Sequence, residues 1–210
     1  MNIRTPYQAE IVARYRRVAA MPDGLFFFTF PLRRRAIDQL HLAPGSSVLE
    51  VGCGSGANFA FLIGAVGPSG RVVGVDLSPE MVAAAQARVR RHAWSNVQVI
   101  ESPAEDMRLD GHFDGLLLFA MHDVLTSQAA LTRSLEHVRP GGRVVVVSPA
   151  LADRFPGKLL NPLAAMVFRR FAVSQAYREQ PWRLLAEQVP GLRVERLGPG
   201  LLFMAVGQVR

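Results

Sequence analysis

Hydrophobic residues follow two periods along this chain, and the two periods alternate through its middle. Between residues 47 and 148, short apolar runs of strand length alternate with segments whose apolar residues recur at helical spacing. The run 113–119 is almost wholly apolar, as expected of a strand that is buried on both faces. This alternation of strands and helices predicts a parallel sheet with helices on both faces. The predicted strands are 47–51, 72–75, 97–100, 113–119 and 143–148, and the predicted helices are 58–66, 79–92 and 128–138.

The two ends of the chain depart from this alternation. Before it, helical patterns cover residues 6–20 and roughly 30–41, and Pro22-Asp23-Gly24 separates them. After it, helical patterns at 159–173 and 181–189 form an insertion. Two last strands, 192–196 and 201–208, flank the turn Gly198-Pro199-Gly200, so a hairpin adds an antiparallel strand to the sheet.

The pattern therefore predicts an α/β fold with seven strands in one domain. No linker is long enough to divide the 210 residues, and this length suits one domain with a sizeable core. We expect a helical cap, a core that binds the ligand, a helical insertion and a terminal hairpin. Their predicted ranges are 1–45, 46–148, 149–189 and 190–210.

Composition narrows the class of protein. Half of the residues are hydrophobic, which excludes a disordered chain. Cys53 is the only cysteine, so the chain cannot form an internal disulfide, and a reducing cytoplasm fits. The polar N-terminus lacks the apolar core of a secretory signal. Because no uncharged apolar run reaches about 18 residues, we expect no transmembrane helix and a cytoplasmic location.

The net charge of +7 comes almost wholly from arginine, since Lys158 is the only lysine. Two clusters, Arg33–Arg35 and Arg169–Arg170, lie beside aromatic residues. One interpretation is a solvated helix face; the other is peripheral contact with an anionic membrane. No nucleic-acid-binding motif accompanies the charge, so we expect no nucleic-acid partner. Oligomeric state stays open.

The most informative segment is Val48–Gly56, an apolar strand that runs into three alternating glycines. Glycine lets the backbone turn sharply, and the N-terminus of the following helix offers N–H groups to a pyrophosphate or a carboxylate. Asp76 ends the next strand, 20 residues after Gly56, the usual distance for a carboxylate that binds ribose hydroxyls. Ser78 is a better cap than Asp76 for the helix that follows.

Two classes of ligand compete for this loop. A dinucleotide site normally reads G-x-G-x-x-G, whereas residues 52–56 read G-C-G-S-G. The charge of Glu50 also opposes a pyrophosphate and suits a ligand that carries an amino group. An NAD-dependent oxidoreductase is therefore the less favoured interpretation.

The segments 48–56 and 74–81 resemble the first two motifs of class I S-adenosylmethionine (SAM)-dependent methyltransferases. The resemblance covers roughly residues 36–148 and is to the branch of quinone-biosynthesis C-methyltransferases and phospholipid N-methyltransferases. It implies a Rossmann-like, doubly wound, mostly parallel sheet and SAM as cofactor. The glycine loop would hold the methionine portion, Asp76 the ribose, and Leu77 and Met81 the adenine. The candidate cofactor-binding residues are Glu50, Gly52, Cys53, Gly54, Gly56, Asn58, Asp76, Leu77, Met81, Ala104, Glu105 and Phe119.

The third motif departs from the family. Similar enzymes place an aspartate on the adenine amino group where this chain has Pro103. The N–H of Ala104 or Glu105, or the carboxylate of Glu105 or Asp106, would have to replace that contact. The fourth motif fits better, because Phe113-Asp114 opens a buried strand and Pro140-Gly141-Gly142 precedes the next.

The candidate catalytic residues are His122 and Asp123, just beyond the fourth strand at the carboxyl edge where such folds bind ligands. His122 has the pKa range of a general base; the other interpretation is that His122 or Asp123 caps a helix or completes a hydrogen-bond network. The thiol of Cys53 is not expected to react, and no spacing suits a metal. Methyl transfer from a sulfonium chiefly requires positioning and exclusion of water.

The acceptor is predicted from the cap and the insertion, which are rich in Phe, Leu, Met and Arg. They suit a hydrophobic or amphipathic small molecule, either an aminolipid headgroup or a quinone or other secondary-metabolite ring. Tyr7 and Tyr15 are candidates to close over the sulfonium. Plain core packing is the other interpretation of the apolar residues. The rival function is a SAM-binding protein without methyl transfer, either a regulator or a non-methylating catalyst.

Overall fold

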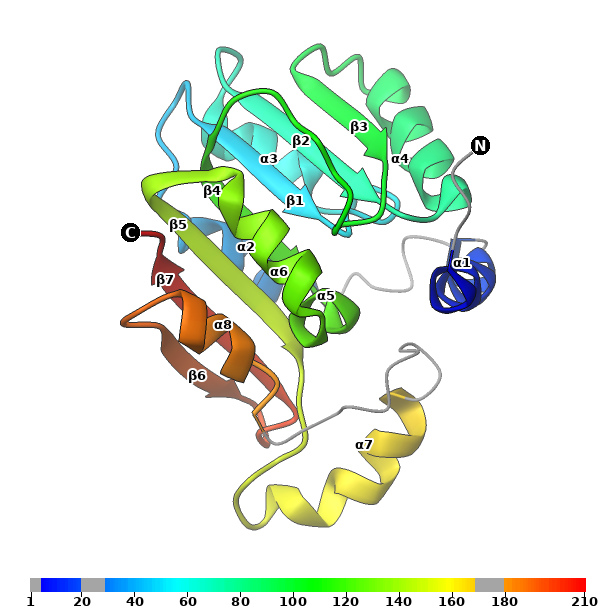
Figure 1. Cartoon of the computed structure of the whole chain (residues 1–210), viewed down its shortest axis with the longest axis vertical. Coiled ribbons are helices and arrows are strands. Elements are labelled where there is room, and N and C mark those ends of the chain that lie inside the picture. Colours follow the sequence, from blue (N-terminus) through cyan, green and yellow to red (C-terminus); the bar gives the residue numbers. More distant parts are fainter. Residues whose placement is uncertain (1–4, 20–28, 169–179) are drawn as a thin grey trace.

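The computed structural model describes residues 5–19, 29–168 and 180–210 and contains one seven-stranded sheet (Figure 1). The strand order is β3-β2-β1-β4-β5-β7-β6. Strands β1 to β5 pair in parallel, and β7 runs antiparallel to both of its neighbours. The predicted fold class is therefore confirmed. The strands are β1 Ser47–Val51, β2 Arg71–Asp76, β3 Val97–Glu101, β4 Phe113–Phe119, β5 Val138–Pro149, β6 Arg193–Leu197 and β7 Leu202–Gln208.

Helices cover both faces of the sheet. Buried residues of α2, α3 and α4 pack on one face, and those of α5, α6 and α8 pack on the other. Helix α5 was not predicted, because five residues directly after a strand are too few to show a helical period. The described helices are α1 Pro6–Ala19, α2 Phe30–Asp38, α3 Phe59–Val66, α4 Pro79–Arg91, α5 His122–Thr126, α6 Gln128–Glu136, η2 Gly157–Leu160, α7 Asn161–Phe168 and α8 Arg183–Gln188.

The core sits on the two central strands, β4 and β5. Side chains that alternate along a strand reach opposite faces: Leu116 and Leu118 join one cluster, and Leu117 joins the other. All three are fully buried. The near-continuous apolar run of β4 thus follows from its burial on both faces, as predicted.

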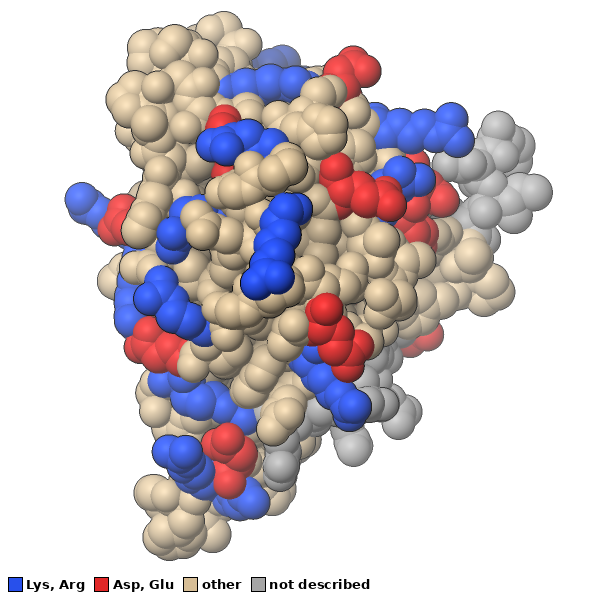
Figure 2. Space-filling view, turned by 60° about the vertical axis from the view of Figure 1, so that its left-hand side comes forward, with Lys and Arg blue, Asp and Glu red and all other residues tan. Residues whose placement is uncertain are grey.

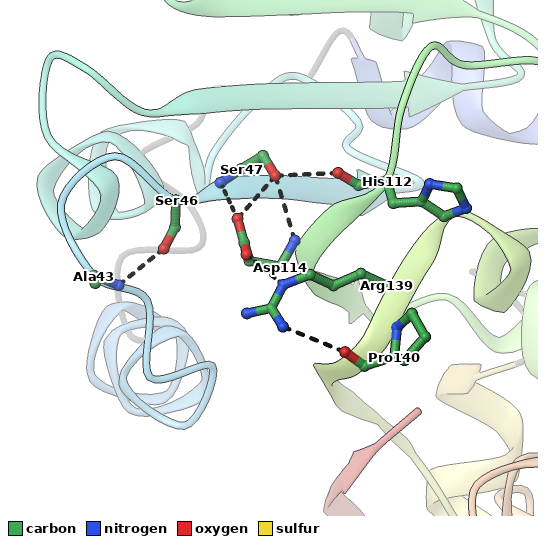
Figure 3. A network of polar contacts seen from close by, with 7 residues as sticks. All are labelled: Ala43, Ser46, Ser47, His112, Asp114, Arg139 and Pro140. Atoms are coloured by element: carbon green, nitrogen blue, oxygen red, sulfur yellow. Dashed lines mark hydrogen bonds and ion pairs between the residues drawn. The ribbon is translucent and has the colours of Figure 1, made fainter. Parts of the chain in front are cut away.

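Asp114 joins the starting ends of three parallel strands (Figure 3). Its Oδ2 accepts from the backbone N–H of Ser47 at 2.7 Å and from the Ser47 hydroxyl at 2.9 Å. Its Oδ1 accepts from Arg139 Nε at 2.6 Å. The polar half of the Phe113-Asp114 motif therefore fixes the register of β1, β4 and β5 at the edge opposite to the glycine loop.

One predicted boundary needs correction, and two other predictions fall wholly or partly outside the described residues. Strand β5 begins at Val138 rather than at 143, because Phe113 pairs with Val138 ahead of an irregularity in the β4–β5 register. The predicted helix 159–173 is described only as far as Phe168, and the predicted break at Pro22-Asp23-Gly24 lies outside the described residues. Within the described ranges, every helix is too short or too polar to cross a membrane.

Two helices lie outside the layers that cover the sheet. Figure 1 shows α1, in dark blue, beyond the arrowheads of the central strands, and α7, in yellow, standing apart from the sheet. The short η2 turn directly precedes α7. Both α1 and α7 therefore border the region past the carboxyl ends of the strands.

Candidate active site

The glycine loop between β1 and α3 has the backbone that the sequence predicts. Gly52, Gly54 and Gly56 have φ values of +75°, +54° and +76°, in the left-handed region that favours glycine. A Cβ at Gly56 would lie 2.6 Å from the Phe59 ring, so packing inside the protein also requires that glycine. A Cβ at Gly54 would meet nothing closer than 3.9 Å. Gly54 is therefore the point where a ligand has room to approach the loop.

Most backbone N–H groups of the loop are already used within the protein. Those of Gly52 and Cys53 donate to the Val75 carbonyl at 2.7 and 3.1 Å. That of Gly54 donates to Asp76 Oδ2 at 2.8 Å, and that of Gly56 donates to the Cys53 carbonyl at 3.0 Å. These four donors are not available to a phosphate, unlike the open N–H groups that the sequence pattern suggested.

Glu50 lies behind the loop as a buried carboxyl group, 1% exposed. Burial raises its pKa to about 8, although the hydrogen bond from Asn58 and the charge of Arg33 act in the other direction. Asn58 donates to Glu50 Oε1 at 2.5 Å and accepts from Arg33 Nη1 at 2.8 Å. Glu50 Oε2 has no hydrogen-bond partner among the described residues. Such an oxygen favours a donor supplied by a ligand.

Arg33 is a site residue that sequence reasoning placed elsewhere. Its guanidinium lies 4.4 Å from the centre of the Phe119 ring, besides its bond to Asn58. Phe119 ends β4, so the arginine connects α2 to the carboxyl edge of the sheet. The sequence offered no signal for this, since it showed Arg33 only as one of three adjacent arginines.

Asp76 ends β2 beside the loop, as predicted. Besides Gly54, its carboxylate accepts from the backbone N–H of Ser78 at 2.9 Å. Burial raises the pKa of Asp76, while these backbone N–H groups lower it. Ser78 caps α4 by accepting from the N–H of Met81, as expected. A carboxylate can accept further bonds at both oxygens, so Asp76 keeps its capacity for ribose hydroxyls.

The residues predicted for adenine lie around the ends of β2 and β3. Met81 is buried with its sulfur nearest to the open face of Gly54, and Leu77 is half-buried. Ala104 and Glu105 are half-buried in the turn that follows β3. Together with the loop, these residues outline one continuous edge from β1 to β3. The thiol of Cys53 is turned away from this edge into the core, where burial raises its pKa well above the usual range.

His122 and Asp123 begin α5, and both are buried, at 3% and 9% exposure. Asp123 Oδ1 accepts from the hydroxyl of Tyr7 at 2.8 Å. Burial and the Asp123 charge raise the pKa of Tyr7 above its usual range. Asp123 thus takes part in a hydrogen bond across the chain, in line with one of the roles that the sequence left open. Catalysis by His122 stays a prediction.

Helix α1 closes the site from outside the sheet. Besides the Tyr7–Asp123 bond, Gln8 Nε2 donates to Glu105 Oε1 at 2.8 Å, and Arg16 pairs with Glu80 at 2.8 Å. Gln8 is 6% exposed, unlike its neighbours on the helix. Gln8 was not predicted as a site residue, because its partner lies 97 positions away along the chain. The side chain of Tyr15 lies outside the described residues.

Comparison with known proteins accords with this geometry. Residues 48–142 match the family described as Methyltransferase domain. A ubiquinone/menaquinone biosynthesis C-methyltransferase of Ectopseudomonas mendocina is 31% identical over 145 residues, which cover 68% of this chain and 54% of that protein. This chain contains a class I SAM-dependent methyltransferase domain. The domain also matches a 37.1 kDa transposon protein of Streptomyces fradiae, 36% identical over 118 residues, which cover 54% of this chain and 33% of that protein.

Solved structures share the fold of this methyltransferase domain. The N-methyltransferase NodS of Bradyrhizobium japonicum, in complex with S-adenosyl-L-homocysteine (SAH), superposes with a TM-score of 0.69 at 19% identity. The match covers 95% of this chain and 98% of that one. The chain spans only about a third to a half of the length of the first two curated relatives.

Proposed function

We propose that this chain transfers a methyl group from SAM to a hydrophobic or amphipathic small molecule. One observation carries the proposal: the glycine loop, Asp76 and the buried carboxyl of Glu50 converge at one sheet edge within the matched methyltransferase domain. The cofactor fits the chemistry of that edge, since the open face of Gly54 leaves room for it and no described residue donates to Glu50 Oε2.

Each part of SAM has a candidate partner. Glu50 would accept from its ammonium group, with Asn58 orienting the carboxylate, and Asp76 would accept from its ribose hydroxyls. Leu77 and Met81 would pack on the adenine, and the backbone at Ala104 or the carboxylate of Glu105 would meet its polar edge. The loop would take its shape from Gly52, Cys53, Gly54 and Gly56. Phe119 and Arg33 would line one side of the site.

The cofactor supplies a methyl group on a sulfonium, which already is a good leaving group. The protein therefore has to align the acceptor and exclude water. An amine acceptor attacks as the free base, whereas a phenol or carbon acid must lose a proton. In that case His122 or Asp123 would accept it. Both are buried, and Tyr7 of α1 bonds to Asp123, so access to Asp123 would require α1 to move.

The acceptor class is proposed as either a quinone-type ring or an aminolipid headgroup. The relative named for ubiquinone and menaquinone biosynthesis favours the ring. In this view the cap 1–45 and the insertion 149–189 select the acceptor, the core 46–148 holds SAM, and the hairpin 190–210 completes the sheet. We place the reaction in the cytoplasm.

An NAD-dependent oxidoreductase is disfavoured by the loop, whose N–H groups at Gly52, Cys53 and Gly54 are already bonded. Calorimetric titration with SAH and with NADH separates the two. We expect SAH alone to bind, and binding of NADH alone would overturn the proposal. Asp76→Ala should weaken SAH binding at least tenfold, since a hydrogen bond to a charged group contributes about 1.5–3 kcal/mol. Asp110→Ala, at an exposed carboxylate, is the matched control.

Radiolabelled SAM then tests the transfer step against panels of quinones, phenols, amines and lipid extracts. Labelled product identifies an enzyme and its acceptor class. Tight SAH binding without product from any panel would favour the rival, a SAM-binding protein that does not methylate.

A further inference from the structure

The surface of η2 and α7 carries an unusual amount of apolar side chain. Phe155, Leu159, Leu163 and Met166 are 78%, 69%, 58% and 63% exposed. Leu163 and Met166 lie three positions apart on α7, Leu159 lies in η2 four positions before Leu163, and Phe155 precedes η2. Contiguous exposed apolar patches usually mark a surface that a partner covers. We call these four residues the η2–α7 stripe.

Hydrogen bonds and close packing attach η2 and the start of α7 to the rest of the fold. Asn161 donates to and accepts from the backbone of Ala152, at 3.0 and 2.9 Å. At Gly157 a Cβ would lie 2.0 Å from the Pro199 carbonyl, so η2 packs closely against the β6–β7 turn. These contacts anchor η2 and the first residue of α7 to the described fold.

Basic side chains border the stripe. Arg154 and Lys158 are exposed beside it. The neighbouring acidic residue, Asp153, pairs with Arg196 at 3.4 Å, so its charge is balanced within the protein. Figure 2 shows acidic and basic side chains interspersed across the face of the molecule that it presents. An apolar stripe with a basic border is the pattern of a surface that docks on anionic lipid.

We infer that the η2–α7 stripe is a docking surface for an anionic lipid membrane. A second copy of this chain fits less well, because self-association along the stripe would bring the like charges together. Of the arginine clusters, the first is largely used within the protein: Arg33 bonds to Asn58, and Arg35 pairs with Glu195 at 2.6 Å. The second cluster lies outside the described residues. The basic border of the stripe consists instead of Arg154 and Lys158.

Docking through the stripe would place the carboxyl edge of the sheet near the membrane. The chain leaves the carboxyl end of β5 at Pro149 and enters η2 eight residues later. Helices η2 and α7 thus follow the carboxyl end of β5, on the same side of the sheet as the glycine loop, which follows the carboxyl end of β1 (Figure 1). Docking would bring that edge close to molecules dissolved in the lipid. The docking itself does not depend on methyl transfer.

Co-sedimentation with vesicles tests the inference. Wild type should sediment with vesicles of phosphatidylcholine mixed with phosphatidylglycerol at low salt, and much less at high salt or with phosphatidylcholine alone. Leu163→Glu and Met166→Glu should each lower the partition at least tenfold, since each loses buried apolar surface and a charge at the interface is worth about fivefold. Ala129→Glu adds the same charge at an exposed position on α6 and is the matched control.

Unchanged thermal unfolding would show that the variants are folded. The inference is overturned if wild type does not bind the mixed vesicles at low salt. It is also overturned if Leu163→Glu and Ala129→Glu reduce binding equally, because net charge alone would then explain it. Light scattering that shows a dimer, abolished by Leu163→Glu, without vesicle binding would assign the stripe to a second copy instead.

Discussion

Glu50→Gln tests the electrostatics of the candidate site without any ligand. Glu50 is fully buried, and its pKa is raised from the ordinary value of 4.5 to about 8. Between these two values the folded protein holds a proton on Glu50 that the unfolded chain has released. Glutamine keeps the shape of the neutral acid and can still accept from Asn58, but it does not titrate.

The sign follows from proton linkage. Because the folded state binds the extra proton, the contribution of Glu50 to stability is complete below about pH 4.5 and is lost as pH rises through about 8. At about 1.4 kcal/mol for each pH unit between the two values, the full loss is about 5 kcal/mol. Glu50→Gln should therefore resemble wild type near pH 5 and be several kcal/mol more stable near pH 8.

Urea unfolding over that range measures the difference between the two proteins. Groups far from Glu50, such as Asp114, titrate in both proteins, so their effects largely cancel in the comparison. Parallel stability curves for wild type and Glu50→Gln from about pH 5 to about pH 8 would refute the reasoning. Glu50 would then be ionised in the folded protein, for example through a stronger interaction with Arg33.

Three further predictions concern the sheet and the helix that closes the site. Burial raises the pKa of Asp114, but the bonds from Ser47 and Arg139 outweigh burial and hold this pKa below its usual range. Asp114→Asn should therefore lower the free energy of unfolding by about 1 kcal/mol at neutral pH, as measured by urea unfolding. That difference should disappear as pH falls below 3.8. Ala120 has φ +60° just past β4, so Ala120→Gly should raise the free energy of unfolding by about 1 kcal/mol; a lower thermal midpoint would contradict this. Tyr7→Phe removes the bond to Asp123, and faster tryptic cleavage within α1 should reveal the looser cap, with an unchanged rate as the contrary result.

Much of the core was determined by short-range patterns in the sequence. Apolar runs and helical periods predict the strands of the parallel sheet, since each element must bury a face with its own period. The spacing from the glycines to Asp76 likewise places loop and carboxylate together, because one helix joins the two adjacent strands. The same patterns could not reveal α5, which is shorter than two helical turns.

The tertiary structure alone decided what surrounds that core. Tyr7 reaches Asp123 across 116 positions, and Arg33 reaches Asn58 across 25, so no local pattern encodes either bond. Hydrophobic periodicity predicted that residues 159–173 form a helix but not whether its apolar stripe finds a partner, which depends on what packs beside it. The sequence thus determined which residues meet at the edge predicted to bind the cofactor. The fold decided which donors there are already used, and left Glu50 buried with one oxygen unsatisfied among the described residues.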